Sequence, residues 1–168
     1  MSYSGAGFVL LSSDLHSVLL VHDRRSNKWG FPKGHRENYD ADDLATAKRE
    51  LFEETGVQET QYRVHEETFK IKKGSGSYIF RYAILSEDER YVRLAPGPSY
   101  EIKGLAWVPV KELVDAVHIL DGNIYLRTWL EDMKTCGPKR SVTLYRSLRL
   151  GLQPSCVSMC PRNIVTCA

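Results

Sequence analysis

The chain has 168 residues, of which 42% are hydrophobic and 26% charged, and its formal net charge is +2 at pH 7. This length and composition indicate one globular domain with a sizeable core. No stretch reaches the roughly 18 apolar residues that a transmembrane helix needs, and residues 1–7 lack the pattern of a secretory signal. We therefore expect a cytoplasmic protein, with the nucleus as the alternative compartment, and no membrane partner.

The charge is unevenly distributed along the chain. Six of the 23 lysines and arginines follow Asp132, the last acid, so residues 1–133 keep 17 cations against 21 acids. The same tail holds all four cysteines, whose spacing fits no zinc pattern: Cys136, Cys156, Cys160 and Cys167. We expect a domain over residues 1–134 and a basic, weakly ordered tail over residues 135–168.

The first half of the chain predicts two strands, a loop and a helix. Residues 7–11 and 18–22 are β-rich runs separated by turn formers, which favours two neighbouring strands. Residues 29–34 are rich in turn-forming residues and predict a loop or a short strand end. Helix formers begin at Asp42, which can cap the first turn together with or in place of Asp43, and Gly56 ends the helix.

The second half predicts strands followed by helices. Residues 62–71 and 77–85 favour a hairpin, and a short strand is expected at residues 104–108. Pro109 suits the first position of a helix that runs to about residue 117. A last amphipathic helix, starting from Asp121 or Asn123, reaches Met133. The order of elements indicates a mixed α/β (α+β) fold.

Three glutamates of the first predicted helix lie on one stripe. At about 100° per residue, Glu50, Glu53 and Glu54 fall together, whereas the inward side carries Leu44, Ala47, Leu51 and Phe52. Like charges at this spacing destabilise a helix, and a divalent cation would remove that penalty. Magnesium prefers such hard oxygen ligands. The alternative interpretation is an ordinary solvated helix face.

The residues around this stripe resemble the Nudix box, G-x5-E-x7-R-E-U-x-E-E-x-G-U, where U is a bulky apolar residue. Residues 49–57 fit its second half at every specified position. The residues that carry the resemblance are Gly34, Arg49, Glu50, Leu51, Glu53, Glu54, Gly56 and Val57. The resemblance implies the Nudix fold, a mixed β-sheet sandwiched between helices.

The first half of the box departs from the pattern. Ala41 stands where the box has its first glutamate, and Gly34 is one residue too far from it. The neighbouring Asp40 is a candidate substitute for the missing acid. In the family this acid is mainly structural, helping to orient the helix and its arginine.

The resemblance also implies roles for the helix residues. Glu50, Glu53 and Glu54 would bind metal and activate water, Arg49 would orient them, and the Lys33 carbonyl would add a further ligand. The implied cofactor is Mg²⁺, with Mn²⁺ as a substitute. Metal-assisted phosphoanhydride hydrolysis requires no covalent nucleophile, in agreement with a domain that lacks cysteine.

The loop at residues 29–35 looks like that of asymmetric diadenosine tetraphosphate hydrolases. That subgroup has a glutamate six residues before a tryptophan, which places it at Glu101 ahead of Trp107. Glu101 is therefore a candidate metal ligand or general base. Its alternative interpretation is a plain loop carboxylate.

Several residues are candidates for substrate binding. Lys33 can meet a phosphate, and His35 can do so or cap the loop. Tyr78 or Tyr82 can stack on adenine, although aromatics in a central strand are more often core. Lys70 belongs to a basic neighbourhood that can hold a polyphosphate or simply aid solubility.

The expected reaction is hydrolysis of diadenosine tetraphosphate to ATP and AMP by metal-activated water. Other options are mRNA decapping, for which RNA would be a partner, and diphosphoinositol polyphosphate hydrolysis. A Nudix-fold binding module without activity is the alternative from another class, supported by Ala41 alone. We expect a small-molecule nucleoside polyphosphate as partner and a monomeric chain.

Overall fold

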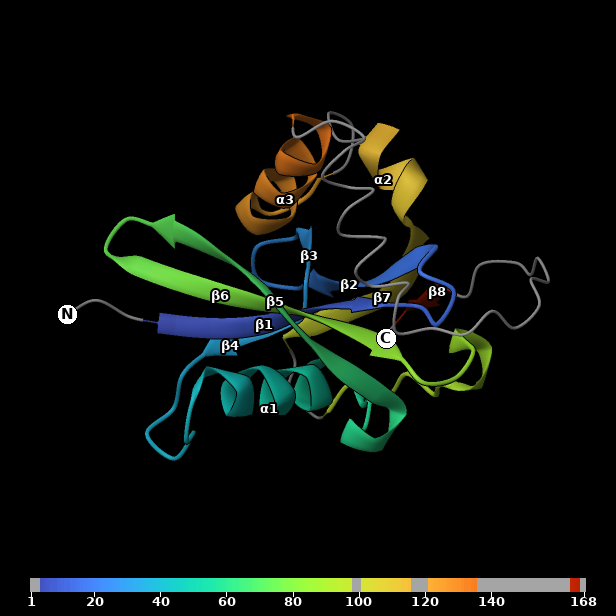
Figure 1. Cartoon of the computed structure of the whole chain (residues 1–168), viewed down its shortest axis with the longest axis horizontal. Coiled ribbons are helices and arrows are strands. Elements are labelled where there is room, and N and C mark those ends of the chain that lie inside the picture. The colour runs from blue at the N-terminus through green and yellow to red at the C-terminus, as the bar shows by residue number, and fades with distance from the viewer. Residues whose placement is uncertain (1–3, 98–100, 116–120, 136–163, 167–168) are drawn as a thin grey trace.

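The computed structural model describes residues 4–97, 101–115, 121–135 and 164–166 (Figure 1). Its strands are β1 (Ser4–Leu11), β2 (Ser17–Asp23), β3 (Trp29–Gly30), β4 (Lys33–His35), β5 (Tyr62–Lys73), β6 (Gly76–Leu85), β7 (Ile102–Pro109) and β8 (Ile164–Thr166). Its helices are α1 (Asp43–Thr55), α2 (Val110–Asp115) and α3 (Ile124–Thr135), with short 3-10 turns η1 (Glu59–Gln61) and η2 (Glu89–Tyr91). In this part of the chain no helix is long and apolar enough to cross a membrane.

The strands form one mixed sheet in the order β5-β6-β1-β2-β7-β8. Strand β1 runs parallel to β6 along its whole length, and the other pairings are antiparallel. Helix α1 covers one face of this sheet, and α2 and α3 cover the opposite face (Figure 1). The expected sheet between helices is therefore confirmed.

Strands β1 and β2 diverge after a single pairing of Leu11 with Val18. The space between them is filled by β4, which pairs with β1, and by β3, which pairs with β2. The loop between β2 and α1 is thus built into the middle of the sheet, directly above α1. This wedge places the residues around Gly34 beside the glutamate helix.

A core cluster lies on each face of the sheet, as the alternation along β1 requires, and a third, smaller one contains Val21, Ile102 and Leu105. Phe8 and Leu10 pack toward α1 with Ala47 and Leu51. The alternate residues of β1 face α3, where the larger cluster includes Val9, Leu11, Phe31, Phe80, Tyr82, Leu126 and Trp129. Burial of these side chains supplies the main driving force for folding.

Helix α1 begins and ends as predicted. The side chain of Asp42 accepts a hydrogen bond from Ala45 N at 2.8 Å, and Gly56 closes the helix at a φ of 77°. Its inward side was predicted wrongly at one position, because Phe52 is 49% exposed. The buried face is centred on Ala47, Leu51 and Thr55, which rotates Phe52 outward.

The strand predictions are confirmed with shifted bounds, but Pro109 was placed wrongly. It is the last residue of β7, in register with Ser17, and α2 starts at Val110. The predicted end of that helix near residue 117 lies outside the described residues. Asn123 caps α3, since its Oδ1 accepts a hydrogen bond from Leu126 N at 3.0 Å.

The tail contributes one strand that the sequence did not predict. Residues 164–166 form β8, which pairs antiparallel with Gly104–Ala106 of β7. The four cysteines and the expected weak order of residues 136–163 fall outside the described residues.

Candidate active site

Strand β4 lies directly on α1 and contacts two of its glutamates. Lys33 N donates a hydrogen bond to Glu54 Oε2 at 3.0 Å. At Gly34 a Cβ atom would collide with the carboxylate of Glu50, so only glycine allows this approach. Gly34 therefore lies in direct contact with the glutamate helix.

Arg49 is held from one side by Asp40. Its Nε and Nη2 atoms donate to Asp40 Oδ1 and Oδ2 at 3.1 and 2.9 Å, a bidentate pair. Asp40 also accepts from Glu37 N and Thr46 Oγ1 and is 8% exposed. These bonds, above all that from Arg49, hold the pKa of Asp40 well below its usual range. Asp40 thus contacts Arg49 as the missing acid at Ala41 was expected to do.

The other side of the same guanidinium holds two glutamates. Arg49 Nη1 donates to Glu50 Oε1 at 2.8 Å and to Glu53 Oε2 at 3.2 Å, while Nη2 also reaches the carbonyl of His35 at 2.9 Å. The hydrogen bonds from Arg49 to Asp40 and Glu50 raise the pKa of Arg49. Arg49 therefore links the loop to the carboxylates and fixes their orientation.

The glutamate stripe does not face solvent evenly, contrary to expectation. The side chain of Glu53 is 50% exposed, whereas Glu54 is only 8% exposed beneath Lys33. Burial raises the pKa of Glu54 to about 8, opposed by the charge and hydrogen bond of Lys33 and reinforced by Glu50 and Glu101. Burial also raises the pKa of Glu50.

This coupling places Glu101 in electrostatic contact with the helix. Glu101 is the exposed residue before β7, and its carboxylate acts on Glu54 across a long sequence separation. The donor set is therefore carboxylate oxygen, which suits a hard divalent cation. Among the described residues, no three His, Cys, Asp or Glu side chains converge closely enough to hold a metal. Arg49 lies between Glu50 and Glu53 and donates a hydrogen bond to each.

The candidate substrate residues separate into two groups. Lys33 Nζ lies 5.5 Å from the ring centroid of Tyr78, and the rings of His35 and Tyr78 are 5.8 Å apart. Tyr82 is a core residue, 6% exposed, whose hydroxyl accepts a hydrogen bond from Trp129 Nε1 at 2.8 Å.

Lys70 lies on a different face from the tyrosines. It is exposed on β5 in register with Ile79, the neighbour of Tyr78, and adjacent residues of a strand point to opposite faces. The structure therefore brings Lys33, His35 and Tyr78 together and leaves Lys70 and Tyr82 apart from them. Tyr125, which also contacts Lys33 at 5.5 Å, was missed because no motif surrounds it in the sequence.

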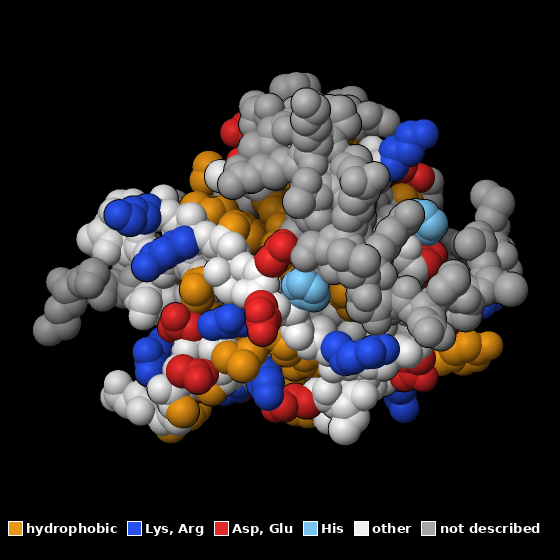
Figure 2. All heavy atoms as spheres, in the orientation of Figure 1, with side chains coloured by type: hydrophobic (Ala, Val, Ile, Leu, Met, Phe, Trp, Pro, Cys, Tyr) orange, Lys and Arg blue, Asp and Glu red, His pale blue; other side chains and the backbone are white. Residues whose placement is uncertain are grey.

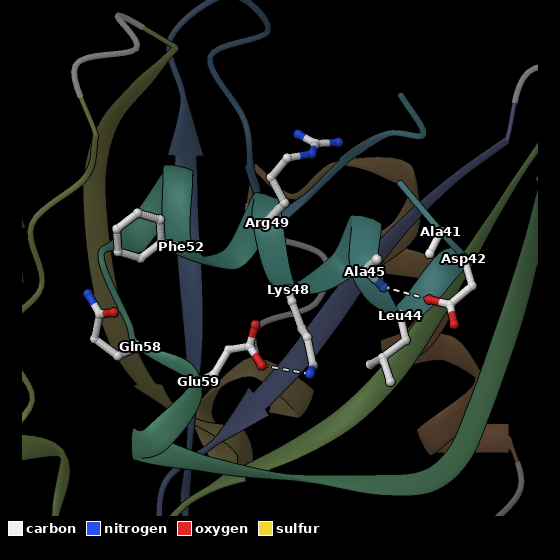
Figure 3. A pocket seen from close by; sticks show the side chains of 9 residues that line it. All are labelled: Ala41, Asp42, Leu44, Ala45, Lys48, Arg49, Phe52, Gln58 and Glu59. Atoms are coloured by element: carbon white, nitrogen blue, oxygen red, sulfur yellow. Dashed lines mark hydrogen bonds and ion pairs between the residues drawn. The ribbon is translucent and has the colours of Figure 1, made fainter. Parts of the chain in front are cut away.

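A pocket of about 600 Å³ lies along the outer side of α1 (Figure 3). Its lining includes Arg49 and Phe52 but none of the three glutamates, and the ion pair of Lys48 with Glu59 crosses it at 2.6 Å. Basic and acidic side chains are interspersed over the region of α1 in Figure 2. The pocket is therefore separate from the three glutamates, which lie on the β4 side of the helix.

Two viral proteins are similar in sequence to part of this chain. The 111R protein of Invertebrate iridescent virus 3, provisionally named a hydrolase, is 37% identical over 95 residues, 56% of this chain and 53% of that protein. A protein of Acanthamoeba polyphaga mimivirus, provisionally named an mRNA-decapping protein, is 27% identical over 115 residues, 63% of this chain and 32% of that protein. The chain thus spans about half and about a third of their lengths.

Solved structures share the fold. The crystal structure of C. elegans Ap4A hydrolase superposes with a TM-score of 0.59 at 23% identity, covering 80% of this chain and 98% of that one. The family model of the NUDIX domain matches residues 1–132, which include the wedge, α1 and Glu101. The chain therefore belongs to the NUDIX family.

Proposed function

We propose that this protein hydrolyses a phosphoanhydride bond in a nucleoside polyphosphate, and that diadenosine tetraphosphate is cleaved to ATP and AMP. The observation that carries the proposal is Arg49, which Asp40 fixes on one side while it orients Glu50 and Glu53 on the other. The loop at residues 29–35 and the similarity to an Ap4A hydrolase support the choice of substrate.

The carboxylates would hold the metal. Glu50, Glu53, Glu54 and Glu101, with the Lys33 carbonyl, are the residues that would hold Mg²⁺, or Mn²⁺ in its place. When bound, the cation neutralises phosphate oxygens and lowers the pKa of a coordinated water. Burial is the main cause of the raised pKa of Glu54, and the charges of Glu50 and Glu101 add to it. A bound cation would offset both effects, because it stabilises the ionised carboxylate.

The remaining residues bind the polyphosphate and take part in the transfer of a proton. A water oxygen forms a bond to phosphorus, and the bridging oxygen leaves with the departing nucleotide. Glu101 has one of two roles in this step: it takes the proton of the water, or it is a further ligand of the cation. Lys33 meets the polyphosphate as a point charge, and His35 and Tyr78 lie within reach of the same region. Tyr82 is not included, because its hydroxyl accepts a hydrogen bond from Trp129 within the core. Lys70 is not included, because it lies on the other sheet face from Tyr78 and the Lys33 side chain.

Product analysis tests this reaction. Wild type, incubated with diadenosine tetraphosphate and Mg²⁺, should release ATP and AMP in equal amounts, and chelation by EDTA should stop the release. Glu53→Gln should lower kcat by about 10²–10³-fold, a range typical of a lost electrostatic group. Glu66→Gln, at an exposed glutamate of β5, is the matched control and should retain wild-type kcat.

A second candidate, mRNA decapping, is favoured by the name of the mimivirus relative. Capped RNA and a diphosphoinositol polyphosphate should therefore be assayed beside diadenosine tetraphosphate. Faster turnover of capped RNA would replace the substrate but keep the chemistry. No turnover of any of the three would leave a binding module as the remaining interpretation.

A further inference from the structure

We propose that Tyr125 is a positioning residue that fixes the ammonium group of Lys33 where the polyphosphate passes the carboxylates. Lys33 Nζ lies 5.5 Å from the centroid of the Tyr125 ring and 5.5 Å from that of Tyr78. The two rings are 4.9 Å apart at an angle of 51°, so they form a two-sided aromatic support for one cation. This inference rests on the proposed function for the identity of the ligand only.

The support comes from three elements that are far apart in sequence. Lys33 belongs to β4, Tyr78 to β6 and Tyr125 to α3. The tyrosines are 4% and 6% exposed, and both pack against Phe80, with the Tyr125 ring 5.6 Å from it. Their positions are therefore fixed by the core, whereas a lysine stem alone would sample many rotamers.

The direction of the Lys33 side chain matters because the backbone of this residue is tied to the glutamate helix. Lys33 N donates a hydrogen bond to Glu54 Oε2 at 3.0 Å, while Nζ lies against the two tyrosine rings. Lys33 therefore connects the aromatic support to the carboxylates. A cation attracted by the ring faces is held by an interaction that leaves its positive charge available to phosphate.

Removing the ring should therefore weaken substrate binding through Lys33. We expect Tyr125→Leu to raise KM for diadenosine tetraphosphate by about three- to tenfold, with kcat changed less than about twofold. The separate variant Tyr125→Phe keeps the ring and should have the KM of wild type. Ile124→Ala, the exposed neighbour on α3, is the control for changes in the helix.

A double-mutant cycle shows whether Tyr125 acts through Lys33. In a Lys33→Met background, Tyr125→Leu should raise KM no further. A further rise of about threefold or more would mean that Tyr125 touches the substrate itself. A KM for Tyr125→Phe above that of wild type would likewise overturn the role of the ring.

Nuclear magnetic resonance of the lysine side chains tests the contact without any substrate. In wild type the methylene protons next to Lys33 Nζ should be shifted upfield by the rings, and Tyr125→Leu should remove most of that shift. Tyr125→Phe should keep it, and the spectrum of the core methyl groups reports whether each variant is folded. If wild type shows the shift but does not hydrolyse diadenosine tetraphosphate, the proposed function is contradicted and the positioning role is not. If wild type hydrolyses the substrate but lacks the shift, the positioning role is contradicted and the proposed function is not.

Discussion

The two halves of the Nudix box meet the same requirement in different ways. From Arg49 to Val57 the box lies on α1 and on the residues that end this helix. The geometry of the helix fixes the spacing between the box residues there. From Gly34 to Ala41 it lies on a strand end and a loop, where no such spacing is imposed. The acid moved by one residue in the loop, whereas the helix half shows no departure.

This difference indicates that the arginine needs a carboxylate in space rather than at one sequence position. Asp40 is buried and held by Glu37 N and Thr46 Oγ1, so its carboxylate is fixed against Arg49. Ala41 is exposed, and its carbonyl accepts a hydrogen bond from Arg36 Nη2 at 2.8 Å. The loop thus has a buried carboxylate at position 40 and an exposed methyl group at position 41.

Removal of the displaced acid should have the largest effect. Asp40→Ala is expected to lower the free energy of unfolding by about 3 kcal/mol, because the partly buried charge of Arg49 loses its bidentate partner. The value of kcat should fall by about tenfold or more as the orientation of Arg49 is lost. Urea denaturation and steady-state kinetics measure the two effects.

The matched control is Asp88→Ala, which removes a half-exposed Asp–Arg pair of 2.7 Å. It should cost less than about 1 kcal/mol. Adding Ala41→Glu to Asp40→Ala should not restore kcat, since position 41 is exposed and does not take the buried place that Asp40 occupies beside Arg49. If Ala41→Glu did restore kcat, the loop could place an acid at the usual box position beside Arg49, and the difference between the two halves of the box would not be fixed by the structure.

Gly34→Ala should damage catalysis more than folding. The added Cβ would collide with the carboxylate of Glu50, which must then turn away from its place beside Arg49. We expect a loss of about tenfold in kcat and about 1–3 kcal/mol in stability. Gly74→Ala, at a hairpin position with nothing within 4 Å, should lower stability slightly and leave kcat unchanged.

The pairing of Asp40 should also give the protein a defined acid sensitivity. Its pKa in the folded state is well below that of the unfolded chain, so ionised Asp40 stabilises the fold above about pH 4. This contribution should be lost progressively as the pH falls below about 4. The difference in unfolding free energy between wild type and Asp40→Asn should be constant from neutral pH to about pH 5 and then shrink; a difference that grows on acidification would contradict the assignment.

The smallest effect is expected on the outer side of α1. Lys48→Met breaks an ion pair with Glu59 whose glutamate side chain is 62% exposed. The change in unfolding free energy should stay below about 0.5 kcal/mol, with kcat unaffected. A tenfold change in kcat would mean that the pocket of Figure 3 belongs to the active site after all.

Local signals in the sequence predicted much of the fold. The cap at Asp42, the left-handed Gly56 and the hairpin at residues 62–85 all depend on neighbouring residues, and the structure has each of them. The strand at residues 164–166 could not be found this way, because its pairing with β7 is a long-range contact.

The site was less predictable than the fold, because helical periodicity fixes which side chains are neighbours but not which way the helix turns. The orientation of α1 on the sheet buries Glu54 and exposes Phe52, whereas the helical pattern predicted Phe52 on the inward side. The contact of Asp40 with Arg49 was anticipated from a single displaced acid. Tyr125 was not, since its approach to Lys33 depends on the packing of α3.

The close packing of the loop against β1 limits where this part of the chain can change in length. The Pro32 carbonyl accepts a hydrogen bond from Phe8 N at 3.1 Å and lies where a Cβ on residue 7 would stand, so Gly7 is required there. Lys33 and Gly34 are therefore anchored, and the extra residue is accommodated further along, between His35 and Asp42. Insertions in that segment can therefore lengthen the loop without moving Lys33 and Gly34 from Glu54 and Glu50.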